Sequence, residues 1–210
     1  MVLEHSDTMA AVLAHEIKNP AALAMAYVGL LRHASEPAEI ADYCNRIQQS
    51  LMDISELVHD LLFAVQNKPE LRSINITDML TEMLEEYRAA FCSNPGILFS
   101  LNAASGLVCH TYEQHLRFVF SNLLKNAVEA TGLPGHITVY AVVDGVYLRV
   151  EICNSLNAAV EKPRGNGMGL SICHWLLGQI GGELQIKNNG QECTAIVSAP
   201  VDFFLPSSQQ

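Results

Sequence analysis

The hexapeptide HEIKNP, at residues 15–20, groups three side chains that together could carry out phosphoryl chemistry. It lies within residues 9–31, which have helical character, and residues four apart share one face of a helix, so Asn19 lies beside His15. A neutral imidazole has one free nitrogen that can attack phosphorus. Glu16 can accept the proton of the other nitrogen and stabilise the cation that forms. This set of residues indicates phosphoryl transfer to His15.

Two asparagines, Asn122 and Asn126, mark a second candidate site within the helical segment NLLKNAVEA at residues 122–130. They share one side of the predicted helix, away from much of its apolar stripe. An amide oxygen is a hard, neutral ligand that suits Mg²⁺, which keeps several waters and phosphate oxygens around it. Taken alone, the pair is better explained as a solvated outer helix face, so the magnesium interpretation depends on its context.

A glycine-rich segment, GNGMGL at residues 165–170, stands directly before another predicted helix. Glycines let a backbone approach phosphate oxygens closely, and the free amide groups at a helix start attract anions. Such a loop is weak evidence by itself, because turns alone produce many glycine-rich segments. Its value comes from its place in the chain, after the histidine motif, the asparagine helix and a predicted hairpin.

These three motifs, in this order, resemble the catalytic core of the bacterial sensor histidine kinases over nearly the whole chain. HEIKNP is similar to that family's H box, NLLKNAVEA to its N box, and GNGMGLSIC to its second glycine box. The resemblance implies an α+β chain in two parts. A helical hairpin forms a dimeric four-helix bundle, and the GHKL-type (Bergerat) ATP-binding α/β sandwich of gyrase and Hsp90 follows. It also implies an ATP- and Mg²⁺-dependent kinase that phosphorylates its own histidine and then an aspartate of a response-regulator receiver domain.

The resemblance also implies roles for individual residues. His15 would take the phosphate, Glu16 would assist, and Asn19 would contact the phosphoryl group and support phosphatase activity toward the regulator. Asn126 would hold magnesium. The other nucleotide-binding candidates are Asn122, Asn154, Lys162, Arg164, Gly165, Gly167, Gly169, Leu170 and Thr194. Among these, Thr194 falls where the wider superfamily often places a threonine that contacts adenine.

One element departs from the family pattern. The usual adenine-recognition box is an aspartate followed by glycines two and four residues later, whereas residues 154–158 read NSLNA. Asn154 can still accept a hydrogen bond from the adenine amine, at a cost on the order of 1 kcal/mol. Leu156 and Ala158 bring side chains where the backbone normally passes close to the nucleotide. The lid up to Gly165 is short, about ten residues, and its charges are Lys162 and Arg164.

Composition narrows the class of partner and the cellular context. A net charge of −10 with only 12 lysines and arginines argues against a nucleic-acid partner. The six cysteines form no CxxC pair and are predicted to be buried thiols of a reducing compartment, with a metal site improbable. The lack of a long apolar run or signal peptide predicts a soluble, cytoplasmic segment. Only 14 residues precede His15, so we expect a piece of a longer protein whose missing upstream region could attach it to a membrane.

The first part of the chain is predicted to be a helical hairpin. We expect a helix over residues 6–32 with a break after Pro20, a connection at residues 34–38, and a second helix. Apolar residues recur along that second helix at spacings of three and four: Ile40, Tyr43, Ile47, Leu51, Ile54, Val58, Leu61 and Val65. Two helices cannot bury such a stripe, so we expect a homodimer, the alternative being that the stripe packs on the second domain.

The helical period stops near Asn67, which divides the chain into domains at residues 1–68 and 69–210. In the second domain, Thr77 and Asp78 are predicted to cap a helix to about residue 91, and a strand follows at residues 97–101. Thr111 is predicted to cap a helix with a broad apolar face. Hairpins are expected at residues 136–153 and around residues 189–190, with a helix at 168–180 between them. This pattern predicts one mixed sheet with helices over one face.

Three functions fit these observations to different degrees. The favoured one is an active kinase that moves phosphate from Mg-ATP to His15 and then to a receiver aspartate. The alternative is a non-enzymatic phosphorelay or adaptor module, in which the altered adenine box has abolished ATP binding. A gyrase-like ATPase is weaker, because that class commonly has a glutamate base where this chain has Asn122, and an amide cannot deprotonate water.

Overall fold

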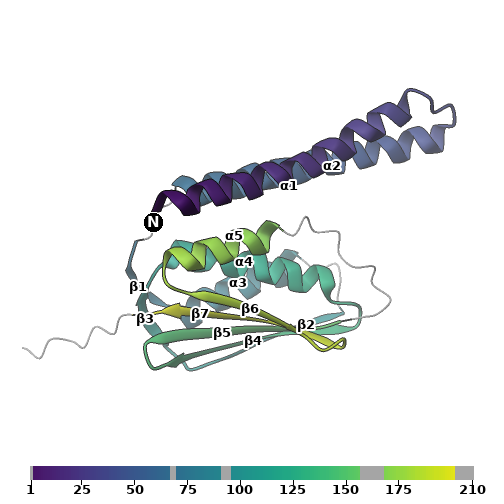
Figure 1. The fold of residues 1–210 in the computed structure, drawn as a ribbon. Coiled ribbons are helices and arrows are strands. Elements are labelled where there is room, and N and C mark those ends of the chain that lie inside the picture. Colours follow the sequence, from purple (N-terminus) through teal and green to yellow (C-terminus); the bar gives the residue numbers. More distant parts are fainter. Residues whose placement is uncertain (1, 67–69, 91–95, 157–167, 202–210) are drawn as a thin grey trace, which may run out of the picture. The chain divides into compact units, whose positions relative to one another are not determined.

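The computed structural model describes residues 2–66, 70–90, 96–156 and 168–201. The chain divides into two compact units, one built mainly from residues 1–67 and the other mainly from residues 68–210. The first unit holds two long helices, and the second holds a β-sheet with a layer of helices (Figure 1). The predicted order of a helical hairpin followed by an α/β sandwich is confirmed.

The hairpin consists of α1 (Val2–Leu31) and α2 (Pro37–Gln66), which pack against each other. Helix α1 runs through Pro20 without interruption, so the expected break at this residue is wrong. Proline removes one helical hydrogen bond and crowds the preceding turn. In α1 the remaining helical bonds and the packing on α2 outweigh that loss.

A tyrosine pair and an arginine join the two helices near the end at which they are connected. The rings of Tyr27 and Tyr43 stack with centroids 6.0 Å apart, and Arg46 donates to the Tyr27 hydroxyl over 3.2 Å. Asp42, one turn before Arg46, accepts from the same guanidinium over 2.8 Å. Buried Ser50 donates to the carbonyl of Arg46, so its hydroxyl is not left without a partner.

One face of α2 leaves large apolar side chains open to solvent. These side chains are separated by nearly whole numbers of helical turns, so they lie on the same side of the helix. They are Ile40, Leu51, Val58 and Leu62, which are 38%, 56%, 40% and 48% exposed. We call these four residues the α2 strip. A single copy of the hairpin therefore does not bury all of its apolar surface. None of the helices in the described ranges combines the length and apolar character needed to cross a bilayer.

The second unit contains two sheets rather than the single sheet expected. The main sheet is mixed and has the order β2-β4-β5-β7-β6, with β2 parallel to β4 and every other neighbour antiparallel. Its strands are β2 (Ile97–Ala103), β4 (Gly135–Asp144), β5 (Tyr147–Ser155), β6 (Glu183–Asn188) and β7 (Glu192–Pro200). A two-stranded sheet of β1 (Arg72–Asn75) and β3 (Val108–Thr111) lies beside it and was not predicted.

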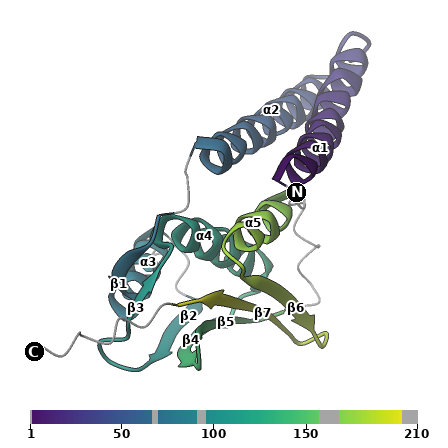
Figure 2. The same ribbon diagram turned by 60° about the vertical axis from the view of Figure 1, so that its left-hand side comes forward.

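Three helices cover one face of the main sheet: α3 (Ile76–Ala90), α4 (Glu113–Ala130) and α5 (Met168–Gln179) (Figures 1 and 2). Strand residues alternate between the two faces. The helix-covered face of β5 is built from Leu148, Val150 and Ile152, all fully or almost fully buried. The apolar face predicted for α4 is also buried, including Phe120 and Leu124. The domain core therefore lies between this helix layer and one face of the sheet.

Both predicted hairpins of the main sheet are confirmed. Gly145 has φ +60° in the two-residue turn between β4 and β5, and Gly190 has φ +87° between β6 and β7. Positive φ favours glycine, because a Cβ would be crowded there. At the second turn, the Asn189 side-chain oxygen accepts from the backbone amides of Gln191 and Glu192 over 3.0 and 2.8 Å. These bonds fix the start of β7.

Two predicted helix caps are wrong. At α3 the capping side chain is Asn75, whose oxygen accepts from the amides of Thr77 and Asp78 over 3.1 and 3.3 Å. Thr77 instead donates its hydroxyl to the carbonyl of Ala104 over 2.7 Å. Thr111 belongs to β3, where its buried hydroxyl donates to the carbonyl of Pro200 over 3.2 Å. Helix α3 begins directly after β1, so Thr77 and Asp78 lie inside the helix, and Thr111 lies in the unpredicted strand β3.

Candidate functional site

The histidine motif lies within the continuous part of α1. The backbone of His15 and Glu16 is helical, while their side chains lie outside the described residues. Asn19 is one turn further along the helix and its side chain is exposed. An uninterrupted helix keeps positions 15 and 19 on the same face, so a group bound at one can reach the other.

Helix α4 presents Asn122 and Asn126 at the border of its buried face, rather than opposite it as the sequence suggested. Both are partly exposed, and Leu123 and Leu124 beside them are buried. The Asn122 amide nitrogen donates to the carbonyl of Phe118 over 3.2 Å, which turns that side chain back onto its own helix. Within the described part of the chain, no residue hydrogen-bonds to the side chain of Asn126. Its amide oxygen is therefore available to a ligand.

The position expected to recognise adenine, Asn154, lies at the end of β5 on the helix-covered face. Its side chain is only 4% exposed, and its amide nitrogen donates to the carbonyl of Ser155 over 3.2 Å. This bond fixes the orientation of the amide, because a flipped side chain would place its oxygen against the Ser155 carbonyl. No donor among the described residues reaches the amide oxygen. Although the residue is largely buried, this oxygen is not one of the fully buried polar atoms that lack a partner, so it remains accessible to a ligand.

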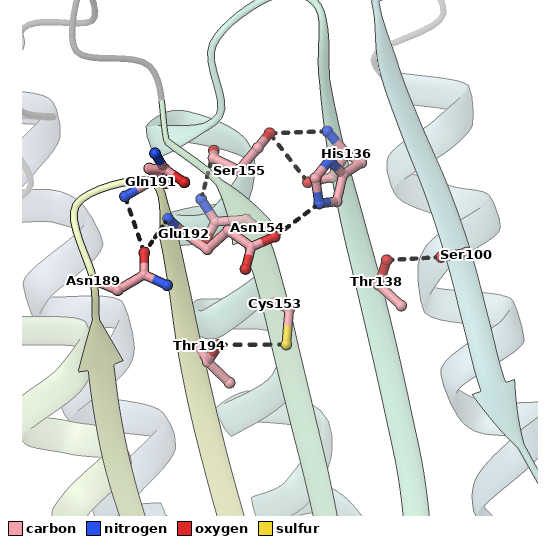
Figure 3. A network of polar contacts seen from close by, with 10 residues as sticks. All are labelled: Ser100, His136, Thr138, Cys153, Asn154, Ser155, Asn189, Gln191, Glu192 and Thr194. Carbon is pink, nitrogen blue, oxygen red and sulfur yellow. Dashed lines mark hydrogen bonds and ion pairs between the residues drawn. The ribbon is translucent and has the colours of Figure 1, made fainter.

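A polar network holds the backbone that supports Asn154 (Figure 3). The hydroxyl of Ser155 accepts from the backbone amide of His136 at the start of β4, over 3.0 Å. The His136 ring lies 3.4 Å from a Glu192 carboxylate oxygen at the start of β7. These contacts join the ends of three neighbouring strands, so they keep the Ser155 carbonyl where it orients the Asn154 amide.

The end of α4 meets the same edge of the sheet. Gly135 begins β4, and a Cβ added there would clash with Thr131, with the carbonyl of Gly132 and with the Ser155 hydroxyl. Thr131 directly follows α4 and is buried. The close approach at Gly135 therefore places the C-terminal end of α4 beside the end of β5. Asn126 and Asn154 belong to two elements that converge at this edge.

The structure does not bring Thr194 together with Asn154. In the register of β5 and β7, Thr194 lies opposite Cys153 and donates its hydroxyl to the Cys153 sulfur over 3.4 Å. Asn154 is the next residue along β5, so its side chain is on the other face of the sheet. The residue directly opposite Asn154 is Cys193, which is partly exposed. Burial, and then the neighbouring Cys153, raise the pKa of the Cys193 thiol.

Most of the expected glycine loop lies outside the described residues. This applies to Lys162, Arg164, Gly165 and Gly167, and also to Ala158 of the altered box. Gly169 and Leu170 belong to the first turn of α5, where helix amide groups have no intrahelical partner. No cluster of three or more metal-binding His, Cys, Asp or Glu side chains occurs in the described ranges. A metal here would thus depend on an amide oxygen, water and the ligand's own phosphates.

Sequence reasoning missed Ser155, His136, Glu192 and Cys193 at this edge. The signals for the first three are weak, because a serine, a histidine and a glutamate at strand ends are ordinary surface residues. Cys193 could have been found from the two-residue alternation of β7 only with the register against β5. That register depends on the length of the β6–β7 turn and on the start of β7, which single-sequence patterns do not specify.

Comparison with known proteins finds two domain families on the chain. Residues 6–69 match the "His Kinase A (phospho-acceptor) domain". Residues 111–203 match the family "Histidine kinase-, DNA gyrase B-, and HSP90-like ATPase". The two matched segments contain the histidine motif, the asparagine helix, the altered adenine box and the glycine-rich segment.

Individual relatives and solved structures agree with these matches. The chain is 24% identical to sporulation kinase C of Bacillus subtilis and 25% identical to the adaptive-response sensory kinase SasA of Synechocystis. The alignments cover 89% and 90% of this chain but only 46% and 57% of those relatives. In fold, it is similar to histidine kinase ThkA in its complex with response regulator protein TrrA, at a TM-score of 0.70 and 23% identity. That match covers 95% of this chain and 63% of ThkA.

Proposed function

The chain belongs to the bacterial sensor histidine kinases and comprises their catalytic core, and from this premise we propose that it phosphorylates His15 with Mg-ATP. In this proposal residues 1–68 form the dimerisation and phosphotransfer hairpin, and residues 69–210 form the catalytic ATP-binding domain. The phosphoryl group then passes to an aspartate on a response-regulator receiver domain. The chain spans about half the length of the relatives it matches, so the signal that controls the reaction lies outside this proposal.

The observation that carries the proposal is the position of Asn154 at the end of β5, beside the end of the helix that carries Asn126. The Asn154 side chain is 4% exposed, and a strand-end network holds it in one orientation. An amide oxygen held in this way accepts a hydrogen bond, which the exocyclic amine of adenine supplies. A pure adaptor would have no need for an amide held in this orientation beside the asparagine helix.

The residues present fit a magnesium-bound nucleotide. Asn126 keeps its amide oxygen free of described partners, and a neutral oxygen suits Mg²⁺ that retains phosphate and water ligands. Lys162, Arg164 and the backbone at Gly165, Gly167, Gly169 and Leu170 would hold the triphosphate, with the first turn of α5 offering amide donors. Asn122 would lie beside this group as a neutral contact. When bound, Mg-ATP supplies the γ-phosphate that is transferred.

At the acceptor, a ring nitrogen of His15 forms the bond to phosphorus while the bond to the leaving ADP oxygen breaks. Glu16 accepts a hydrogen bond from the other ring nitrogen, stabilising the positive charge that develops on the imidazole. Asn19 can donate its amide to a phosphoryl oxygen from one helical turn away. Toward a phosphorylated regulator, we assign Asn19 the role of orienting a water that attacks the phosphorus while the bond to the aspartate oxygen breaks, which would give the chain phosphatase activity.

A homodimer and a receiver domain are the partners we propose. A second copy of the chain would cover the α2 strip and turn the hairpin into a four-helix bundle. The similarity to ThkA, which was solved with the response regulator protein TrrA, supports a regulator as the phosphate acceptor. Since ATP and regulators of this kind are found inside the cell, we place the reaction in the cytoplasm.

The proposal is tested by incubating the chain with ATP labelled at the γ-phosphate. We expect a protein-bound label that is lost in acid and stable in base, as a phosphoramidate would be. The variant His15→Gln should carry no label, while the matched control His33→Gln, on the exposed end of the hairpin, should be labelled like the parent. Label that persists in His15→Gln would overturn the assignment of His15.

A further inference from the structure

The main sheet has an open face on the side opposite its helix layer. No helix from the described part of the second unit lies on that side (Figures 1 and 2). Side chains along a strand alternate between the two faces, so the neighbours of the buried core residues Ala141 and Leu148 project from the open face. These neighbours include Tyr140, Val142 and Tyr147.

Apolar side chains gather at one end of the open face, next to the turn between β4 and β5. They are Tyr140 and Val142 of β4, Tyr147 of β5 and Val146 of the turn itself, each between 46% and 60% exposed. We call these four residues the open-face patch. Val142 pairs with Arg149, two residues along β5 from Tyr147, so Val142 and Tyr147 are diagonal neighbours. Neighbouring apolar side chains left exposed in this way indicate a surface that another segment or molecule covers.

A shallow hollow adjoins the open-face patch. Its volume is about 320 Å³, and it is lined by Asp144, Tyr147, Arg149, Gly181, Glu183 and Ser198. Arg149, Ser198 and Glu183 are paired across β5, β7 and β6, so the hollow lies on the open face. A Cβ at Gly181 would lie 3.9 Å from the Pro200 ring, which places the hollow beside the last residue of β7.

The chain leaves β7 at a fixed point beside this patch. The amide of Val201 donates to the carbonyl of Val146 over 2.9 Å, and the carbonyl of Pro200 accepts from the Thr111 hydroxyl over 3.2 Å. These two bonds hold both sides of the peptide group that joins Pro200 to Val201. The residues that follow therefore start from a fixed position at the edge of the open-face patch.

The next residues of the sequence are apolar and close enough to cover the patch. Asp202, a residue type common in turns, is followed by Phe203, Phe204 and Leu205, which lie outside the described residues. An extended chain spans about 3.5 Å per residue, so Phe204 can lie up to about 10 Å from Val201. Neighbouring strands are about 4.8 Å apart, so the same length reaches from β7 across β5 to β4.

We propose that residues 203–205 pack on the open-face patch of the same chain, with one phenylalanine ring in the hollow beside Tyr147. The helix layer then covers one face of the sheet, and this apolar segment covers the apolar part of the other. The tether favours this occupant over a separate partner, because a short linker holds a segment at an effective concentration on the order of millimolar. This packing does not depend on the proposed kinase function.

The experiment is hydroxyl-radical footprinting of the intact chain, in which mass spectrometry measures the rate of oxidation of each side chain. The parent is compared with a chain that stops at Val201 and with the double variant Phe203→Ser with Phe204→Ser. The matched control is Gln209→Ser with Gln210→Ser, which changes two residues of the same stretch outside the apolar segment.

We expect Val142 and Tyr147 to be oxidised about fivefold faster or more when the segment is removed or made polar, because protection follows the fraction of molecules in which it is bound. Leu98 is exposed and pairs with His136, six residues along β4 from Val142, so its rate should be the same in every chain. The glutamine control should match the parent. Equal rates at Val142 and Tyr147 in the parent and in both tail variants would overturn the inference, and a second copy covering the patch would give this result.

A disulfide trap tests the same packing without removing the segment. Phe204→Cys is combined with Val142→Cys or, as the matched control, with Leu98→Cys. Oxidised glutathione takes up the two electrons and two protons that the paired thiols lose, and peptide mapping with non-reducing electrophoresis identifies the bond. We expect the pair at 142 and 204 to join within one chain about tenfold faster or more than the control pair. Equal rates for the two pairs, or bonds formed only between chains, would contradict the inference.

Discussion

The hairpin and the sandwich differ in how completely one copy of the chain buries its apolar side chains. In the sandwich, alternating strand residues and the apolar face of α4 meet in a core whose largest members are fully buried, among them Phe120, Ile137 and Leu148. In the hairpin, the α2 strip stays open. The sandwich has its own buried core, although side chains such as Leu98 and Val142 stay exposed, whereas the hairpin buries few of its large apolar side chains.

This contrast matches the chemistry that each part has to perform. A nucleotide site requires side chains held in fixed positions, as the network around Asn154 illustrates. A phosphoacceptor helix must be reached by two different partners, first the nucleotide domain and then a regulator. Exposed positions such as Asn19 suit that need. In the proposed kinase, the sandwich would supply a rigid binding site and the hairpin an accessible acceptor.

The largest expected effect comes from breaking the α2 strip. The variant Leu51→Glu with Val58→Glu should weaken dimerisation by about a hundredfold or more, because a dimer would bury four unpaired carboxylates. The control Gln48→Glu with His59→Glu places the same number of carboxylates on exposed polar positions of α2. Sedimentation equilibrium measures both. A strip variant that dimerises like the control would show that this surface is not the interface.

A smaller effect is expected from a buried histidine in the sandwich core. Burial lowers the pKa of His115 below its ordinary 6.5, so the unfolded chain takes up a proton that the folded chain resists. The free energy of unfolding should therefore fall as the pH drops below about 6.5, the ordinary histidine value. His115→Leu should reduce this dependence, while replacing the exposed His33 of the hairpin should not.

Fluorescence of Trp175, the only tryptophan, follows unfolding of the sandwich in these variants, since it lies on α5. Unfolding is measured in urea at several pH values between 5 and 8. If His115→Leu and the parent lose stability in parallel over this range, the buried imidazole is not the cause.

The smallest expected effect concerns nucleotide binding at the altered adenine box at the end of β5, where the sequence departs from the family pattern that α4 keeps. Asn154→Asp would restore a charged acceptor for the adenine amine, and ATP should bind up to roughly tenfold tighter. GTP should gain nothing, because guanine presents a carbonyl oxygen that the new carboxylate would repel. Competition binding with both nucleotides measures this. An equal gain for the two nucleotides would mean that residue 154 does not face the base.

The sequence was sufficient to predict long helices with a regular apolar pattern and turns marked by glycine. The long stripe of α2, the apolar face of α4 and the turns at Gly145 and Gly190 all follow from local rules, and the structure has them. The break at Pro20 was wrong because packing along a long helix outweighs one local defect.

The short strands and the details of the site depend on contacts that local rules do not contain. β1 and β3 have four residues each, too few to show an alternation. Asn75 at the end of β1 caps α3, and α4 starts after β3 without a side-chain cap. The functional motifs were readable as residue types, yet which residue of β7 lies opposite Asn154 required the register of β7 against β5. A shift of one residue exchanges the two faces of a strand, and local patterns do not specify that shift.

The measurement that tests the central claim most directly is calorimetry of Mg-ATP binding to the chain and to Asn126→Ala. We expect the parent chain to bind Mg-ATP despite its altered adenine box. We also expect Asn126→Ala to weaken ATP binding much more when magnesium is present than when a chelator removes it, because the amide oxygen acts through the metal. Equal losses in the two conditions would assign Asn126 another role. No heat of binding by the parent chain in either condition would contradict the kinase proposal and favour a non-enzymatic relay or adaptor.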